Sequence, residues 1–390
     1  MTAGGGSHGP LGEDHNAWPE IPLEPEALPS LGDAIQDLET PVAIVDLDRM
    51  EANIEFVQAY CEQLGVRNRI HIKTHKIPQI AARQVAAGSA GITVQKLGEA
   101  EVFAASGLGL DDFFLPYNLV GPAKLRRLRV FLDRYPNIEL SLTCDGELVA
   151  EGLNMVARQT RRDLKVWVEC DAGLGRAGVP QPGQALDLAR SIEKLSGLTF
   201  GGLMSFTADA EPSIEFMTEA LAVFGRAGWP TPEITMGGSR QLRWVHRVPG
   251  VTEHRPGTYV FHDRQTVQQG GWSYDDCACT VRTTIVSRPT AERAILDAGS
   301  KAITPETMGL DGLLGHIVEF PESRFYRLSE EHGYVDFSAY PDTERPKVGD
   351  VLSVVPNHVC TTVNMYSWLV GARRGRVEVV WPVAARGRVR

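Results

Sequence analysis

The chain has 390 residues, of which 43% are hydrophobic and 23% are charged, and it carries a formal net charge of −10. This composition is typical of a globular protein with one large core and a second domain, and it excludes disorder or a fibre over most of the length. The negative charge argues against nucleic acid or an anionic membrane as partner, because both require a basic surface patch.

The cysteines and the apolar runs indicate the compartment. Six cysteines are scattered without a CxxC pair, no signal peptide is evident, and no apolar run reaches the roughly eighteen residues of a membrane span. We therefore expect a cytoplasmic protein without a disulfide framework and without a membrane partner.

The first segment, residues 1–38, differs from the rest in composition. It begins with several glycines and stays rich in proline through Pro29. This composition predicts a flexible segment that starts disordered and then runs extended over the body of the protein.

From Thr40 onward, strand-like and helix-like stretches alternate. Val42–Asp46 reads as a strand and Arg49–Leu64 as a helix. Compact apolar runs then predict eight buried strands, at 69–74, 91–95, 112–117, 138–143, 164–170, 198–205, 233–237 and 252–261. Most are separated by helical periodicity, at 77–87, 99–106, 122–134, 147–158 and 182–195. The pattern predicts an α/β fold, a (β/α)₈ TIM-type barrel over residues 39–267, with a doubly wound open sheet as the alternative.

The texture changes after about residue 268. Shorter runs with β-branched residues and turn signals predict a C-terminal all-β domain over residues 268–390, with strands at 279–287, 293–297, 315–319, 333–337, 350–355 and 377–382. Because the barrel is complete without it, the Val42–Asp46 strand is expected to join this domain together with the N-terminal segment. The Arg-rich last stretch is interpreted as a solvated end.

One basic stretch, residues 69–76, is the first candidate for chemistry. Read as a strand, it places Arg69, His71, Lys73 and His75 on one face. A lysine that is partly desolvated among other cations loses its proton more easily, so Lys73 could act as a nucleophile in Schiff-base chemistry. The alternative interpretation is a basic strand edge that faces water.

Two glycine-containing loops follow the seventh and eighth predicted strands. They are Met236–Ser239 and Arg255–Tyr259. In (β/α)₈ barrels the loops after these strands often bind phosphate. Glycine lets the backbone approach a phosphate closely, and the hydroxyls of Ser239 and Thr258 supply donors.

The loop after the fifth predicted strand, Glu169–Gly178, is rich in glycine and contains one arginine, Arg176. A permanently charged guanidinium suits an electron-rich ring or its phenolic oxygen. The alternative is a structural pair with Asp171. A Schiff-base lysine, two phosphate-binding loops and this arginine together predict a site for pyridoxal phosphate.

His358 and Cys360 form a candidate metal site in the β domain. Read as part of a strand over Val355–Thr362, they point to one face, where an imidazole and a thiolate form a soft half-site for Zn²⁺. The commoner arrangement of such residues is a buried cysteine beside a hydrogen-bonded histidine, and the sequence leaves both open.

These residues resemble a known group, the D-threonine aldolases and D-serine dehydratases, which are fold-type III pyridoxal phosphate enzymes related to alanine racemase. The likeness runs from about Thr40 to the C-terminus. It is carried by Thr40–Pro41, His71–Lys76, Asp171–Gly178, Gly237–Gly238, Pro256–Tyr259, Asp297–Lys301, Glu331–Gly333 and Pro356–Cys360.

The resemblance implies roles for individual residues. Lys73, and not Lys76, is similar to the Schiff-base lysine, while His358 and Cys360 are similar to the ligands of a divalent metal, zinc before manganese. The cofactor-binding residues that follow from the motifs are Lys73, Arg176, Gly238, Ser239, Gly257, Thr258 and Tyr259. The resemblance also implies a homodimer in which the β domain of one subunit closes the barrel of the other.

Two departures from the aldolases bear on the reaction. The aldolases usually have an aspartate where this chain has Cys360, as the dehydratases do, and the stretch Phe206–Pro212 lacks the histidine proposed to take the β-hydroxyl proton. We therefore expect a lyase that dehydrates D-β-hydroxy-α-amino acids such as D-serine or 3-hydroxy-D-aspartate. The alternatives are retro-aldol cleavage to glycine and an aldehyde and, more remotely, a racemase. A non-catalytic pyridoxal phosphate carrier is disfavoured by the presence of residues 268–390.

Overall fold

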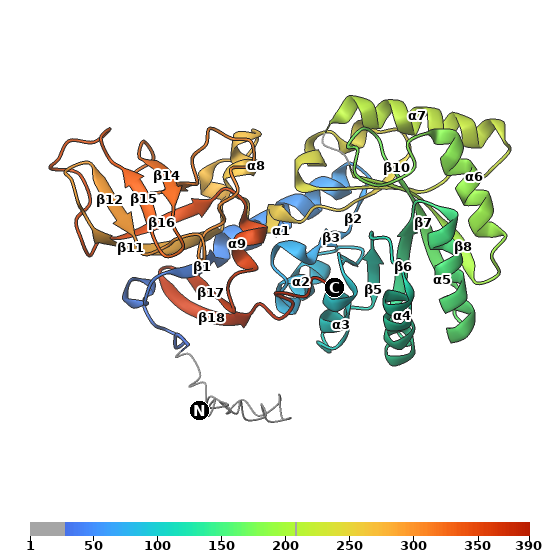
Figure 1. Cartoon of the computed structure of the whole chain (residues 1–390), viewed down its shortest axis with the longest axis horizontal. Coiled ribbons are helices and arrows are strands. Elements are labelled where there is room, and N and C mark those ends of the chain that lie inside the picture. The colour runs from blue at the N-terminus through green and yellow to red at the C-terminus, as the bar shows by residue number, and fades with distance from the viewer. Residues whose placement is uncertain (1–27, 207–208) are drawn as a thin grey trace, which may run out of the picture.

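A computed structural model describes residues 28–206 and 209–390. It contains a barrel and a separate, mostly β domain that lie side by side (Figure 1), and this confirms the predicted architecture. The expectation of a flexible segment falls largely on residues 1–27, which lie outside the described residues. Within the remaining part, Gly32 and Asp33 exchange backbone hydrogen bonds with Val377, so this part runs along the β domain as expected.

The barrel is built entirely from parallel strand pairs. Its strands are β2 (Arg67–Asn68), β3 (Ile70–His71), β4 (Ile92–Thr93), β5 (Asp112–Leu115), β6 (Glu139–Cys144), β7 (Leu164–Cys170), β8 (Leu198–Ser205), β9 (Ile234–Met236) and β10 (Val251–His254). β10 pairs with β2, and β3 pairs with β4. Because one residue, Arg69, separates β2 from β3, the sheet returns to its start, and the open-sheet alternative is wrong.

Helices cover the outside of the barrel (Figure 1). The described helices are α1 (Leu47–Gln63), α2 (Pro78–Ala86), α3 (Leu97–Ala104), α4 (Pro122–Arg134), α5 (Glu147–Thr160), α6 (Pro182–Glu193), α7 (Ala210–Arg226), α8 (Arg264–Gln268) and α9 (Val359–Val363). A proline occupies the first turn of α2, α4 and α6, where its missing N–H has no partner to lose. In the described part of the chain, no helix combines the length and the apolar character needed to cross a membrane.

The β domain is one branched sheet. Its strands are β1 (Val42–Asp46), β11 (Cys279–Ser287), β12 (Arg293–Leu296), β13 (Gly315–Ile317), β14 (Arg324–Leu328), β15 (Gly333–Asp336), β16 (Val351–Pro356), β17 (Trp368–Arg373) and β18 (Arg376–Pro382). β1 pairs with β11 and β17, as expected for the Val42–Asp46 strand. β14 and β17 were not expected. Phe325 and Val354 belong to the buried core of this domain. The boundary between residues 267 and 268 stays a prediction.

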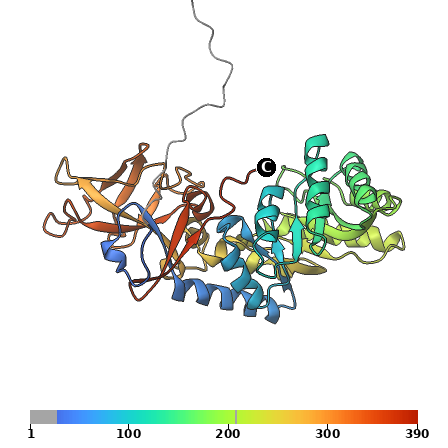
Figure 2. The ribbon, with the colours of Figure 1, turned by 90° about the horizontal axis from the view of Figure 1, so that it is seen from below.

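The Arg-rich last stretch ends exposed to solvent over residues 386–390, as expected, but its backbone is bonded to the barrel. Val383 and Ala385 are buried, and the backbone N–H of Ala385 donates to the carbonyl oxygen of Lys76. Further along, the N–H of Gly98 donates to the carbonyl of Arg390. Figure 2 shows the end of this stretch beside the barrel helices. Val383 and Ala385 thus pack inward before the terminal arginines begin, while the residues from Arg386 onward remain in water.

Candidate active site

A cavity of about 350 Å³ lies at the carboxyl ends of the barrel strands and is also lined by residues of the β domain. Parallel strands place the residues that follow them at one end of the barrel, which is where such folds carry their chemistry. Of the nine residues proposed from the sequence, eight line this cavity: Lys73, Arg176, Gly238, Ser239, Gly257, Thr258, His358 and Cys360. Tyr259 is the exception.

Lys73 lies in a short 3₁₀ turn, Ile72–Thr74, directly after β3. Its Nζ atom lies 5.8 Å from the centre of the Phe206 ring. Burial is the main cause that lowers the pKa of Lys73, and Arg176 and Arg255 lower it further, against an opposing contribution from Cys360. An amine in this environment is more readily deprotonated and hence nucleophilic.

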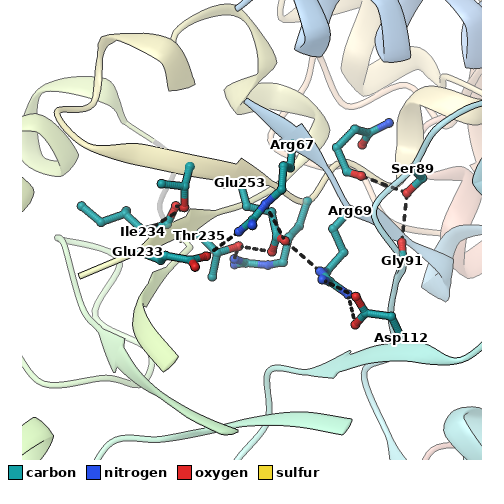
Figure 3. Close-up of polar contacts among 12 residues, drawn as sticks. Arg67, Arg69, Ser89, Gly91, Asp112, Glu233, Ile234, Thr235 and Glu253 are labelled. Carbon is teal, nitrogen blue, oxygen red and sulfur yellow. Dashed lines mark hydrogen bonds and ion pairs between the residues drawn. The ribbon is translucent and has the colours of Figure 1, made fainter. Parts of the chain in front are cut away.

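Of the other residues in the 69–76 stretch that can carry charge, Arg69, His75 and Lys76 do not share the cavity with Lys73. The strand ends at His71, so the expected alternation stops there. Arg69 turns to the amino end of the barrel, where it forms a bidentate ion pair with Asp112, at 2.6 and 3.0 Å (Figure 3). His75 is fully buried, and Lys76 Nζ lies 2.8 Å from Glu99 Oε1. Lys76 is thus engaged elsewhere, whereas Lys73 faces the cavity.

His71 lines the cavity in a defined neutral form. Its Nδ1 accepts the backbone N–H of Lys73 at 3.4 Å, and its Nε2 lies 3.0 Å from Gln95 Oε1. The Gln95 amide nitrogen donates to the carbonyl of Pro116, so its oxygen faces the imidazole. These contacts place the proton on Nε2. Burial, together with Lys73, holds the pKa of His71 well below its usual value.

The loops after β9 and β10 meet at Ser239. Its Oγ accepts the backbone N–H groups of Gly257 at 3.1 Å and Tyr259 at 3.0 Å. Gly238 has a φ of +132°, a backbone conformation that favours glycine. The Tyr259 side chain is buried away from the cavity, with its hydroxyl 2.7 Å from Gln84 Nε2. Tyr259 therefore contributes its backbone to this region and not its ring.

The backbone is also crowded at Gly257. A Cβ atom there would lie 2.9 Å from the carbonyl oxygen of His71 and 3.0 Å from Thr74 Oγ1. Contacts this short require the neighbouring backbone to move, so only glycine fits here without a shift. The loop after β10, the second predicted phosphate-binding loop, is thus packed directly against the turn that carries Lys73.

The Arg176 side chain is not paired with Asp171. The Asp171 carboxylate accepts the backbone N–H groups of residues 173–175, whereas Arg176 Nη2 lies 3.6 Å from Glu169 Oε1. The Arg176 guanidinium carbon lies 5.1 Å from the centre of the Phe206 ring. Arg176 is thus held over the cavity beside Lys73.

Arg255 is a cavity residue to which the sequence analysis assigned no role. It is buried and lines the cavity, its Nη2 donates to the Ser205 carbonyl at 3.1 Å, and its guanidinium carbon lies 5.3 Å from the centre of the Phe114 ring. Burial lowers its pKa to about 10, so it remains charged at neutral pH. The sequence did offer a signal for this role, because Arg255 directly follows β10 and stands two residues before Gly257 in the predicted phosphate-binding loop.

His358 and Cys360 lie next to each other, but at the start of a helix and not on the predicted strand. β16 ends at Pro356, and His358 is the N-cap of α9. The two side chains lie close enough to shift each other's pKa. Burial alone would lower the pKa of His358, but Cys360 and Glu306 raise it to about 9. Burial alone would raise the pKa of the Cys360 thiol, but His358 lowers it. The predicted pair is therefore present, brought together by the start of a helix.

Contacts on either side fix this pair. His358 Nδ1 lies 2.5 Å from Glu306 Oε2, and Cys360 Sγ lies 3.3 Å from Thr74 Oγ1, next to Lys73. Over residues 28–206 and 209–390, no group of three or more histidine, cysteine, aspartate or glutamate side chains is placed to hold a metal ion. His358 and Cys360 could thus supply two ligands, with the remaining positions left to water or substrate.

The chain matches known families over most of its length. Residues 45–265 match the N-terminal domain of alanine racemase, and residues 278–372 match a putative serine dehydratase domain. The first match spans more than half of the chain. The chain belongs to the alanine racemase-like family of pyridoxal phosphate enzymes.

Relatives in this family include both reaction types considered above. The chain is 33% identical to a D-threonine aldolase of Arthrobacter sp over 94% of this chain and 97% of the relative. It is 31% identical to a D-threo-3-hydroxyaspartate dehydratase of Delftia sp. (strain HT23), over 85% and 93%. The names of both relatives are those of lyases that act on D-hydroxy amino acids. The chain is therefore an enzyme of the lyase class.

Solved structures of family members agree with the fold. The crystal structure of D-threonine aldolase from Filomicrobium marinum is 27% identical, with a TM-score of 0.84 over 93% of this chain and all of that chain. A cysteine-to-alanine mutant of a D-threo-3-hydroxyaspartate dehydratase in the metal-free form is 27% identical, with a TM-score of 0.79 over 90% and 98%.

Proposed function

We propose that the chain is a pyridoxal phosphate- and divalent metal-dependent dehydratase of D-3-hydroxy amino acids, of the D-serine or 3-hydroxy-D-aspartate type. The observation that carries this proposal is the pair of His358 and Cys360 at the edge of the cavity, within hydrogen-bonding reach of the turn that holds Lys73. It unites a soft metal half-site with a nucleophilic amine in one cavity.

The cavity fits pyridoxal phosphate in size and in its donors. Lys73 would hold the cofactor covalently through Nζ, and the N–H groups and hydroxyls of Gly238, Ser239, Gly257 and Thr258 would bind its phosphate. Arg176 and Arg255 would face the ring. When bound, the cofactor supplies an electron-withdrawing ring that stabilises negative charge at the substrate Cα.

The donor set of His358 and Cys360 fits a divalent metal. One imidazole nitrogen and one thiolate sulfur favour Zn²⁺, with Mn²⁺ as the second choice. Because Glu306 binds Nδ1 of His358, Nε2 is the ring nitrogen left to ligate. When bound, the metal supplies Lewis-acid polarisation of the substrate β-hydroxyl, which makes it a better leaving group.

The protein side chains then divide the remaining work. Lys73 Nζ, whose pKa is lowered by burial, takes the proton from the substrate Cα. His71 stays neutral and keeps its Nε2 proton toward Gln95, so it orients the Lys73 turn without competing for the Cα proton. Phe206 covers the same part of the cavity with an apolar ring, which excludes water from the amine.

The aldolase reaction is the second candidate. The 33% identity to a D-threonine aldolase over nearly the whole chain favours it. Cleavage of the Cα–Cβ bond needs a base for the β-hydroxyl proton, however, and the stretch Phe206–Pro212 contains no histidine to serve as that base. We therefore place dehydration first. A racemase would not require the metal, so its activity would survive chelation.

One incubation distinguishes these reactions. The purified protein, loaded with pyridoxal phosphate and Zn²⁺ or Mn²⁺, is given D-serine, D-threonine or 3-hydroxy-D-aspartate, and both product pairs are measured. Ammonia with a keto acid is the expected outcome. Glycine with an aldehyde and no ammonia would replace the dehydratase by the aldolase, and formation of the L-enantiomer alone, unaffected by chelator, would establish a racemase. Gel filtration of the same sample tests the proposed homodimer.

A further inference from the structure

Arg255 is a buried cation without a direct counter-ion. Over the described residues it forms no ion pair within 4 Å, and its guanidinium donates to two neutral acceptors, Thr235 Oγ1 at 2.6 Å and the Ser205 carbonyl oxygen at 3.1 Å. Arg176, the other arginine of the cavity, does have a carboxylate partner in Glu169. A buried charge is costly when it is unpaired, so the surroundings of Arg255 require an explanation.

The explanation lies one hydrogen bond further from the cavity (Figure 3). The Thr235 hydroxyl donates to Glu253 Oε1 at 2.8 Å, and Glu253 Oε2 accepts Arg69 Nε at 2.9 Å. Arg69 in turn is clamped by Asp112. Positive and negative side chains thus alternate through the barrel, from Arg255 at the cavity to Asp112 at the amino ends of the strands. The only neutral group in this chain of contacts is the Thr235 hydroxyl, which lies between Arg255 and Glu253.

We propose that Thr235 and Glu253 are positioning residues that act through Arg255: they hold its guanidinium in place without neutralising it, so that its positive charge is offered to the cofactor in the cavity. This inference rests on the proposed function, since it requires pyridoxal phosphate in the cavity. It adds two residues that do not line the cavity.

The direction of the hydrogen bonds is what carries the proposal. The single proton of the Thr235 hydroxyl is committed to Glu253, so a lone pair is left to face Arg255. Without Glu253 the hydroxyl could rotate and point its proton at the guanidinium. A carboxylate in direct contact would hold Arg255 in place equally well, but the resulting ion pair would neutralise its positive charge.

The packing around Arg255 leaves it little freedom. A Cβ atom at Gly237 would lie 3.0 Å from Arg255 Nη2, so the guanidinium passes directly over this glycine. Thr235 is fully buried and Glu253 is 2% exposed. Glu253 cannot move toward Arg255 without leaving Arg69. The four residues Arg255, Thr235, Glu253 and Arg69 are therefore held as one rigid unit.

The test compares two threonine-to-valine substitutions that are chemically identical. Thr235→Val removes the hydroxyl between Arg255 and Glu253. Thr252→Val, the control, removes a hydroxyl on the same strand pair, β9 and β10, that bonds the backbone of Ile234. Thr235→Ser keeps the hydroxyl and serves as the rescue. Each protein is titrated with pyridoxal phosphate, and the absorbance of the bound cofactor is recorded from pH 6 to pH 10.

We expect Thr235→Val to weaken cofactor binding by about tenfold or more, which corresponds to one lost hydrogen bond to a charged group. Its absorbance maximum or the pH midpoint of that absorbance should also shift. Thr235→Ser and Thr252→Val should remain within about twofold of the unmodified protein and keep its spectrum. Glu253→Gln should change the spectrum in the same sense as Thr235→Val.

Two results would overturn the inference, and they are distinguishable. If Thr235→Val matches Thr252→Val in cofactor affinity, spectrum and pH midpoint, Thr235 has no positioning role and the proposed function stands. If the unmodified protein takes up no pyridoxal phosphate at all, both the inference and the proposed function fail. Because Thr235→Val is nearly isosteric, the test remains valid even if Glu253→Gln fails to fold.

Discussion

The buried ion pair between Lys76 and Glu99 should contribute strongly to stability. The two side chains are 10% and 2% exposed, and Nζ and Oε1 are 2.8 Å apart. The other Glu99 oxygen accepts the backbone N–H of Gln95 at 2.6 Å. Substitution Glu99→Gln keeps the shape and one acceptor but removes the negative charge. It leaves the Lys76 ammonium buried without a counter-ion, which costs about 3–5 kcal/mol.

A matched control lies two residues further along α3. Glu101 pairs with Arg127 at 2.7 Å, but both side chains are about one-third exposed. Water screens such a pair, so Glu101→Gln should cost less than about 1 kcal/mol. The free energy of unfolding is measured by urea titration of each variant in the same buffer. The double substitution Lys76→Met with Glu99→Leu, which removes both charges, should recover most of the loss.

The outcome that would refute this reasoning is equal destabilisation by Glu99→Gln and Glu101→Gln. It would mean that water reaches the Lys76 ammonium, and that its burial between the barrel and the C-terminal stretch does not hold in solution. A double variant less stable than Glu99→Gln would instead show that the two side chains contribute by packing and not by charge.

Three further predictions concern the cofactor and pH. Lys73→Ala should abolish the absorbance band near the visible edge that a lysine-bound pyridoxal phosphate gives, and a band that persists would identify another lysine as the nucleophile. Gly257→Ala should destabilise the protein by about 1–3 kcal/mol and weaken cofactor binding, because its Cβ meets the Lys73 turn; Gly183→Ala, where a Cβ meets nothing within 4 Å, is the control, and equal behaviour of the two would contradict the crowding. Burial lowers the pKa of His75 and His254 to about 3. Below pH 6.5 these histidines are therefore protonated in the unfolded chain but stay neutral in the folded chain. Stability is therefore lost as the pH falls below 6.5, by about 2 kcal/mol for each histidine at pH 5. Urea titrations of the unmodified protein and of His254→Asn at pH 7 and pH 5 measure this, and identical losses for both proteins would exclude His254 as a cause.

Much of the barrel follows from local pattern. The runs at 164–170 and 198–205 match β7 and β8 at both ends, and the run at 112–117 is β5 with a later predicted end, because a strand buried on both faces reads as a continuous apolar run. α4 begins and ends at the predicted residues, Pro122 and Arg134, since proline starts a helix favourably. The apolar pattern did not predict the ends of very short strands. The run at 69–74 contains only the two-residue strand β3, because pairing with the neighbouring strands decides its length.

The candidate site was predictable in its residue types but not in its geometry. His71 and Lys73 do line one cavity, but through a 3₁₀ turn that period-two alternation cannot represent. His358 and Cys360 adjoin through a helix start and not a strand. In both places side-chain contacts between the barrel and the β domain, such as that of Cys360 with Thr74, stabilise a local conformation that the segment alone does not specify.

The sequence by itself determined the order of the elements, the division into barrel and β domain, and the short motifs from which Lys73 is predicted as the reactive lysine. Only the tertiary structure decided which end of the barrel each charged residue serves. Arg69 and Lys73 are four positions apart, but one binds Asp112 at the amino ends of the strands and the other faces the cavity. The reason is that a buried charge takes its partners from strands distant in sequence: Arg255 depends on Thr235, and Thr235 on Glu253.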